Sequence, residues 1–152
     1  MKDTLTLKYP NIPPSLNSLY QTNRRTGVVY MVKEGKAFKE EFSKYAKENW
    51  ISKIHSFNSD AVYKINFDFY FPEEEIINKE FGKDKRIKNK YKKVDVDNRV
   101  KLLLDLVSSV FGFNDTQVFS FSAQKYMTFG SDRATGVTIE EVNLEDFKAI
   151  VA

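Results

Sequence analysis

The segment KKVDVDNRVKLLLDLV, residues 92–107, places closely spaced carboxylates directly before a leucine-rich run. At about 100° per residue, most apolar residues between 97 and 111 fall on one face of a helix. Asp97 and Asp105 fall on the opposite face, and Lys101 lies midway between them, four residues from each. The pattern predicts an amphipathic helix over about 97–111 whose apolar face packs on the rest of the chain.

The carboxylates of this segment have two interpretations. Asp95 and Asp97 would point to the same side of an extended segment, and at about 5 Å two carboxylates repel by roughly 3 kcal/mol at an effective dielectric near 20. A hard cation such as Mg2+, which takes carboxylate, water and phosphate oxygens, would relieve that repulsion. Alternatively, Asp97 caps the helix, and Lys101 joins Asp97 and Asp105 in a surface ion-pair relay. Asp105 lies about 12 Å from Asp97 along the axis, too far for the two to share a metal easily.

The rest of the chain predicts an α+β fold. A first long helix begins near Glu34 and carries aromatic residues at spacings of three and four. Alternating apolar and polar residues indicate strands at 4–9, 61–71, within 115–129 and at 134–142, with a short strand or hairpin at 22–31. We expect a single domain over 1–152, with a small mixed or antiparallel sheet and two main helices packed on one face. The last two strands are expected to pair as a hairpin.

Composition limits the functional classes. The 152 residues are 41% apolar and 30% charged, which is typical of a soluble globular domain. The absence of cysteine excludes disulfides, thiolate zinc sites and a cysteine nucleophile. No apolar run approaches the roughly 20 residues of a membrane span, and the first residues lack the apolar core of a signal peptide, so we expect a cytoplasmic protein. His55, the only histidine, is expected at the surface or its boundary.

Positive charge is concentrated in one segment. Residues 79–93 contain eight Lys or Arg against two acidic residues, or +6, whereas the whole chain carries +3 and the remainder therefore −3. This segment belongs to a predicted basic loop at about 73–94, and three glutamates at its start, Glu73, Glu74 and Glu75, are expected to face solvent. The charge favours a polyanionic partner such as nucleic acid. A solvated, mobile loop is the alternative.

The segment VDVDNRVKLLLDLV followed by FGFNDTQVFSFSAQK resembles the RusA family of Holliday junction resolvases. The family motifs are Asp-x-Asp-Asn, a Lys three residues later, an Asp four further on, then Asp-x-Gln-Val and a Lys ten residues after that Asp. IPPSLNSLY and EGKAF in the first third of the chain also match family motifs. The matching positions are Asp95, Asp97, Asn98, Lys101, Asp105, Asp115, Gln117, Val118 and Lys125.

The resemblance implies a Mg2+-dependent homodimeric endonuclease, with Mn2+ as a substitute, that cuts four-way DNA junctions by paired symmetric nicks. Asp95, Asp97 and Asp115 would be the catalytic, metal-binding carboxylates, and Lys101 the essential lysine beside them. We expect the chain to return after the helix and bring Asp115 to the other two, although a plain turn residue is the alternative for Asp115. The remaining alternatives for the protein are a DNA-binding structural module without catalysis and a nuclease for other branched DNA.

The other predicted site residues support the carboxylates or contact DNA. Asn98 and Asp105 are assigned supporting roles, Asp105 as a partner of Lys101. The expected DNA contacts are Lys125, Arg24, Arg25, Lys90, Lys92 and Lys93. Two features depart from the family pattern: Asn114 stands where the family commonly has an acid, and the stretch between Pro72 and Asp95 is longer than expected.

Overall fold

The computed structural model describes residues 4–15, 20–50, 52 and 60–151. In chain order the strands and helices are β1 (Thr4–Tyr9), β2 (Tyr20–Thr22), β3 (Val29–Met31), α1 (Lys33–Asn49), β4 (Val62–Pro72), α2 (Glu73–Ile76), α3 (Asp97–Phe111), β5 (Val118–Thr128) and β6 (Ala134–Val142). Short 3-10 turns lie at Asp115–Gln117 and Leu144–Phe147. The helix expected over 97–111 is confirmed.

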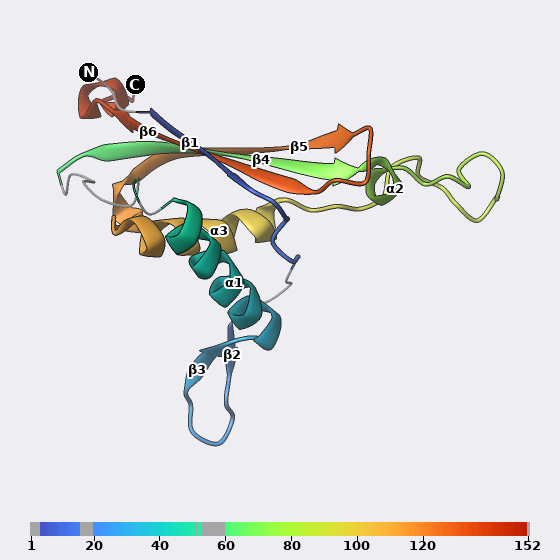
Figure 1. Ribbon diagram of the computed structural model, residues 1–152, viewed down its shortest axis with the longest axis horizontal. Helices are drawn as coiled ribbons and strands as arrows, with labels where there is room; N and C mark the ends of the chain where they lie inside the picture. The colour runs from blue at the N-terminus through green and yellow to red at the C-terminus, as the bar shows by residue number, and fades with distance from the viewer. Residues whose placement is uncertain (1–3, 16–19, 51, 53–59, 152) are drawn as a thin grey trace.

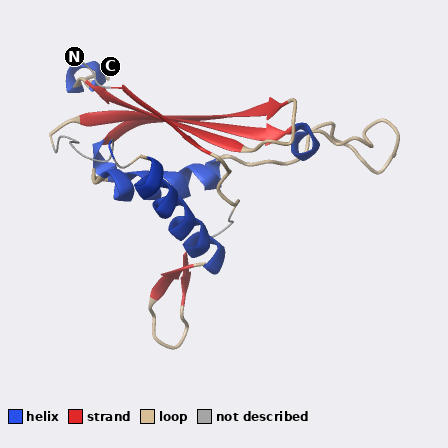
Figure 2. Cartoon of the chain, in the orientation of Figure 1, coloured by secondary structure: helices blue, strands red, loops and turns tan. Residues whose placement is uncertain are grey.

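One four-stranded sheet organises the chain, in the order β1-β6-β4-β5. β4 runs antiparallel to β6 and parallel to β5, so the sheet is mixed. α1 and α3 both lie on one face of this sheet, which confirms the predicted α+β arrangement (Figure 1). The small β2–β3 hairpin projects beyond the start of α1, and a long loop projects beyond α2 (Figure 2).

The expected hairpin of the last two strands is wrong. β5 and β6 each pair with β4, which lies between them, so the loop after β5 crosses the end of β4. Ile65, Phe67 and Phe69 of β4 are all completely buried. A strand this apolar gains most from a central place in the sheet, where neighbours cover both of its edges. Alternation identified the strands, but it could not identify their partners.

The core lies between the sheet and the two helices. Leu103 and Val107 of α3 are fully buried in this core, and Phe42 and Ala46 of α1 are equally buried. Aromatic contacts join the layers: the rings of Trp50 and Phe111 stack with centroids 6.1 Å apart, connecting the end of α1 to the end of α3. Tyr9 of β1 contacts the rings of Phe38, Phe42 and Tyr45. The apolar face of α3 is thereby fixed, and its polar face is directed away from the core.

Replacement of Phe67 by Ala should lower the free energy of unfolding by about 3–5 kcal/mol, because it leaves a cavity where a fully buried ring was packed. Chemical denaturation of the purified protein measures the change. Phe129→Ala is the matched control, since this ring is fully exposed, at 103%, and its loss should change stability by less than about 0.5 kcal/mol. Equal losses for the two variants would contradict the assigned core.

Candidate functional site

α3 presents the predicted polar residues along one side. Asp97 is the first residue of the helix and is exposed, as is Lys101, while Asp105 is half-buried. The N-cap position belongs to Val96, which provides no side-chain hydrogen bond, so the suggestion that Asp97 caps the helix is wrong. Without a capping role, the Asp97 carboxylate is available at the surface. Gly112, with φ of +77°, ends the helix in the left-handed conformation that favours glycine.

Arg99 holds the segment that carries Asp95. Its Nη1 donates to the carbonyl oxygen of Asp95, and its Nε donates to the carbonyl oxygen of Pro13 at 2.9 Å. The guanidinium lies over the ring of Phe71, 5.3 Å from its centroid. Burial, followed by the charge of Arg133, lowers the pKa of Arg99. One side chain therefore joins the loop that contains Pro13, the end of β4 and the start of α3.

Sequence reasoning gave Arg99 no role. The available signal was its position, because it is the one charged residue that falls on the apolar side of the predicted helix. Such a residue needs partners for its donors, and the structure supplies two backbone carbonyls. No periodicity in the sequence identifies those partners, since Pro13 lies 86 residues away.

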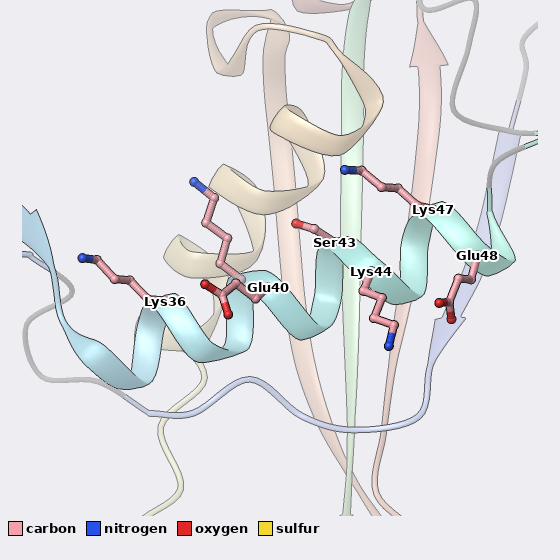
Figure 3. A pocket seen from close by; sticks show the side chains of 7 residues that line it. Lys36, Glu40, Ser43, Lys44, Lys47 and Glu48 are labelled. Atoms are coloured by element: carbon pink, nitrogen blue, oxygen red, sulfur yellow. The ribbon is translucent and has the colours of Figure 1, made fainter.

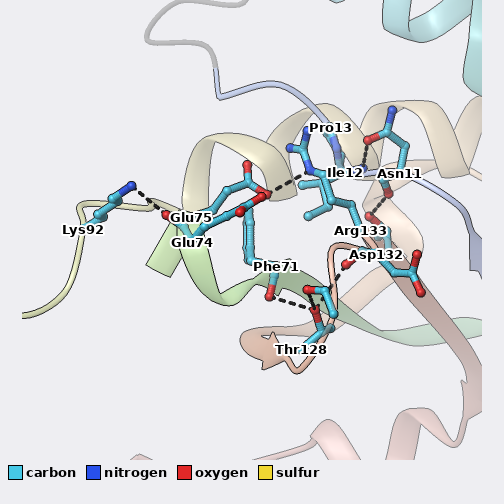
Figure 4. A network of polar contacts seen from close by, with 12 residues as sticks. Asn11, Ile12, Pro13, Phe71, Glu74, Glu75, Lys92, Thr128, Asp132 and Arg133 are labelled. Atoms are coloured by element: carbon cyan, nitrogen blue, oxygen red, sulfur yellow. Dashed lines mark hydrogen bonds and ion pairs between the residues drawn. The ribbon is translucent and has the colours of Figure 1, made fainter. Parts of the chain in front are cut away.

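A pocket of about 410 Å³ opens beside Asp95. Its lining contains both charge signs and comprises Ser15, Phe71, Glu75, Lys92, Lys93, Val94, Asp95 and Arg99. Lys93 Nζ lies 4.0 Å from Asp95 Oδ2, an exposed pair that contributes less than about 1 kcal/mol. Glu75, expected to face solvent, is half-buried instead and pairs with Arg133 Nε at 3.3 Å (Figure 4). Glu73 and Glu74 are exposed as expected.

Asp105 connects α3 to the base of the β2–β3 hairpin. Burial raises its pKa most, the charge of Asp115 raises it further, and Lys101 and a hydrogen bond with Tyr20 act in the opposite direction. The pKa of Tyr20 is itself raised, first by burial and then by Asp105. The charge of Lys101 acts on Asp105, but the two side chains, both in the described part of the chain, form no ion pair within 4.0 Å, so the predicted Lys101–Asp105 partnership stays a prediction. The charge of Asp115 acts on Asp105, so Asp115 lies near Asp105, which belongs to the second half of α3.

The three predicted metal-binding carboxylates are not brought together within one chain. Among the residues that the structure describes, no three Asp, Glu or His side chains form a group able to hold a metal. Asp95 and Asp97 lie at the start of α3, whereas Asp115 follows its end, and a 15-residue helix is about 22 Å long. The expected return of Asp115 is wrong for the single chain because the turn after Gly112 leads directly into β5.

Asn114 and Gln117 have a structural role in the segment Asn-Asp-Thr-Gln, residues 114–117, because they cap its 3-10 turn. The side chain of Asn114 accepts from Thr116 N at 3.0 Å, and Gln117 Oε1 accepts from Asn114 N at 2.9 Å. Gln117 Nε2 also donates to the carbonyl oxygen of Ala61 at 2.9 Å, just before β4. This reciprocal cap fixes Asp115 at the first position of a 3-10 turn, so Asp115 is a turn residue as well as an exposed carboxylate.

The predicted DNA-contacting residues lie on three separate elements. Lys125 of β5 donates from Nζ to the carbonyl oxygen of Val94 at 3.1 Å, which brings it beside Asp95. Arg24 and Arg25 lie in the turn of the β2–β3 hairpin, where the Asn23 side chain accepts from Arg25 N at 2.9 Å.

The remaining predicted contacts lie in the basic segment. Lys92 Nζ donates to the carbonyl oxygen of Glu74 at 2.6 Å (Figure 4), and Lys90 Nζ lies over the ring of Tyr91. Lys92 and Lys93 also line the pocket beside Asp95. His55 falls outside the described residues.

A second hollow lies on the outer face of α1. It measures about 710 Å³ and is formed between long side chains of this one helix: Lys36, Lys39, Glu40, Ser43, Lys44, Lys47 and Glu48 (Figure 3). Lysines and glutamates alternate there, and none of the predicted site residues lines it. Its size reflects extended surface side chains, so we assign it no ligand.

Comparison with known proteins decides the family. A family model described as Endodeoxyribonuclease RusA matches residues 11–140, which includes every predicted site residue. The chain belongs to this family. It is therefore an endodeoxyribonuclease of the kind that acts on Holliday junctions, and RusA nucleases in general depend on a metal ion. Among curated proteins, none matched the chain.

The RusA family match covers the motifs between Asp95 and Lys125. The structure places these motifs just before α3, on α3, and on the turn and strand that follow it. No described helix of this RusA protein is long and apolar enough to cross a bilayer.

The raised pKa of Asp105 gives a pH-dependent prediction. A carboxyl group whose pKa is raised on folding binds its proton more tightly in the native state, so it favours folding at low pH and opposes folding as the pH rises through its folded pKa. Asp105→Asn should therefore raise the melting temperature of metal-free protein at pH 7, and the gain should shrink below about pH 4. Thermal unfolding at both pH values measures this, with exposed Asp132→Asn as the control. An equal gain at both pH values would refute the assigned cause.

Proposed function

We propose that this RusA protein resolves four-way DNA junctions by Mg2+-assisted phosphodiester hydrolysis, placing paired symmetric nicks, and that Mn2+ can replace Mg2+. The observation that supports the proposal most is the family match together with the exposed carboxylate and lysine side chains on one side of α3. We further propose that the whole chain works as one nuclease domain in the cytoplasm. A nuclease for other branched DNA is the alternative that a substrate panel separates.

The donor set suits a hard divalent cation. Asp95 and Asp97 offer exposed carboxylate oxygens two residues apart, and Asp115 adds a third from its turn. A bound ion would stabilise charge on the scissile phosphate and lower the pKa of a bound water. The chain also contributes Lys101, which follows Asp97 by one helical turn and would counter negative charge developing on the phosphate.

Other side chains position these groups. Arg99 fixes the backbone of Asp95 through its bond to the Asp95 carbonyl, and Lys125 fixes the neighbouring carbonyl of Val94. Asn98 stands beside Asp97 in the first turn of α3, half-buried. We propose that Asp105, on which the charge of Lys101 acts, orients Lys101 on the exposed side of α3. We propose that Arg24, Arg25, Lys90, Lys92 and Lys93 contact DNA phosphates.

We infer that a second subunit completes the acidic site. Asp95 and Asp97 lie at the start of α3, and Asp115 follows its end. A two-fold axis perpendicular to this helix would bring the start of α3 in each subunit close to the end of α3 in the other, and so would form two acidic sites. β5 supports such pairing because it is an edge strand of the sheet and its Phe121 is 59% exposed. Each dimer would then contain two equivalent sites, one for each nick.

Asp97→Asn should abolish cleavage of a labelled four-way junction in Mg2+ while retaining junction binding, because it removes a metal ligand and a negative charge near the DNA. Gel-based cleavage and binding assays on the same protein measure both properties. Asp132→Asn, with the same loss of one exposed carboxylate, is the control and should cut normally. Normal cutting by Asp97→Asn would disprove the assigned site.

Subunit complementation tests the shared site. Asp95→Asn and Asp115→Asn should each be inactive, but a mixture allowed to exchange subunits should recover cleavage. In a mixed dimer, one site contains both substitutions and the other contains neither, so the unaltered site should nick one strand. If all three carboxylates came from one chain, each site would keep one substitution and the mixture would remain inactive.

A further inference from the structure

The segment between Ile77 and Tyr91, here called the basic arm, is an ordered projection rather than a plain loop. Ile77 and Tyr91 form an antiparallel bridge at its base, where Asn78 N also donates to the Lys90 carbonyl at 2.8 Å. The Asn78 side chain donates to the Asn89 carbonyl at 2.6 Å. Beyond this base the arm extends away from the sheet and α2, as Figure 1 shows.

The tip of the arm has its own internal contacts. Lys83 N and Asp84 N both donate to the Glu80 carbonyl at 2.9 Å, and Ile87 N donates to the Asp84 carbonyl at 3.1 Å. Arg86 closes this turn through an ion pair with Asp84 at 2.9 Å. The arm therefore carries its charges on a defined backbone, and binding need not order the whole segment.

Four lysines of the arm are unpaired in the part of the chain that the structure describes. Lys79, Lys83, Lys85 and Lys88 are exposed, and their side chains form no hydrogen bond or ion pair with the described part of the chain. The arm holds six Lys or Arg against two acidic residues, one of which Arg86 already neutralises. α1 differs, since its five lysines are interleaved with four glutamates. The basic arm should therefore attract a polyanion more strongly than the surface of α1 does.

We propose that the basic arm binds the phosphate backbone of a duplex arm of the junction, next to the strand that is cut. The proposal rests on the proposed function and adds a substrate contact to it. Tyr91 at the base lies only four residues before Asp95, so DNA held by the arm continues toward the acidic site. Lys90 lies over the ring of Tyr91 at 5.7 Å, which favours phosphate contact over base stacking at that ring.

Two charge-matched variants test the proposal. The arm variant replaces Lys79, Lys83, Lys85 and Lys88 with Gln, and the control replaces Lys36, Lys39, Lys44 and Lys47 of α1 with Gln. Both remove four positive charges, so any effect of net charge is equal. Both are made in Asp97→Asn protein, and the dissociation constant for a labelled four-way junction is measured without divalent metal at several salt concentrations.

The arm variant should bind at least ten-fold more weakly at moderate salt. The negative slope of log affinity against log salt should become less steep by about 2 to 3.6, because each lost phosphate contact contributes about 0.9. The α1 control should stay within about two-fold of the parent protein and keep its slope. Similar losses in both variants, or no loss in the arm variant, would overturn the proposal.

A deletion provides a second test. Replacing residues 79–89 by a two-residue Asn-Gly turn should keep the Ile77–Tyr91 base and reproduce the reduced slope. Circular dichroism and the melting temperature report whether each variant is folded. Because junction cleavage by the otherwise unchanged protein tests the proposed function separately, failure of the arm proposal would leave that result standing, and the reverse also holds.

Discussion

Burial of one face of α3 in the core that it shares with the sheet is the constraint on which the other features depend. Leu103 and Val107 reach zero exposure in the core cluster that also contains Phe67 of β4, which is equally buried. Each such side chain contributes roughly 1.5–3 kcal/mol, so the helix cannot rotate about its axis without a large loss. The opposite face must then display Asp97 and Lys101 to solvent. A hydrophobic requirement thus fixes the orientation of polar groups that contribute little to stability themselves.

The start of α3 depends on long-range polar contacts in addition to this packing. Arg99 joins Pro13, Asp95 and Phe71, and Lys125 joins β5 to Val94. These bonds fix the backbone of Val94 and Asp95 shortly before the helix, where no regular secondary structure holds the chain. A comparable device operates beyond the helix, where Asn114 and Gln117 form a reciprocal cap. The two ends of α3 are therefore held independently.

The division of acidic residues between those two ends links the fold to the proposed mechanism. A RusA nuclease acts on a substrate with approximate two-fold symmetry, and a symmetric dimer presents two equivalent sites to it. If each site draws on both subunits, a lone chain cannot cut DNA, and catalysis becomes conditional on assembly. The β2–β3 hairpin and the basic arm project from different parts of the fold (Figure 1), so in the proposed dimer each subunit would offer separate elements to different regions of a branched DNA.

The sequence by itself determined the amphipathic helix, the main strands, the concentration of charge before Asp95 and the family, because these depend on local periodicity and on the spacing of residue types. Tertiary structure alone decided that β4 separates β5 from β6, that Glu75 pairs with Arg133, and that Asp115 lies near Asp105 instead of Asp97. Strand order, ion-pair partners and the direction of the chain after a turn depend on contacts between residues far apart in sequence. Such contacts depend on which residues are buried together in the whole fold, and a local sequence pattern does not determine which residues those are.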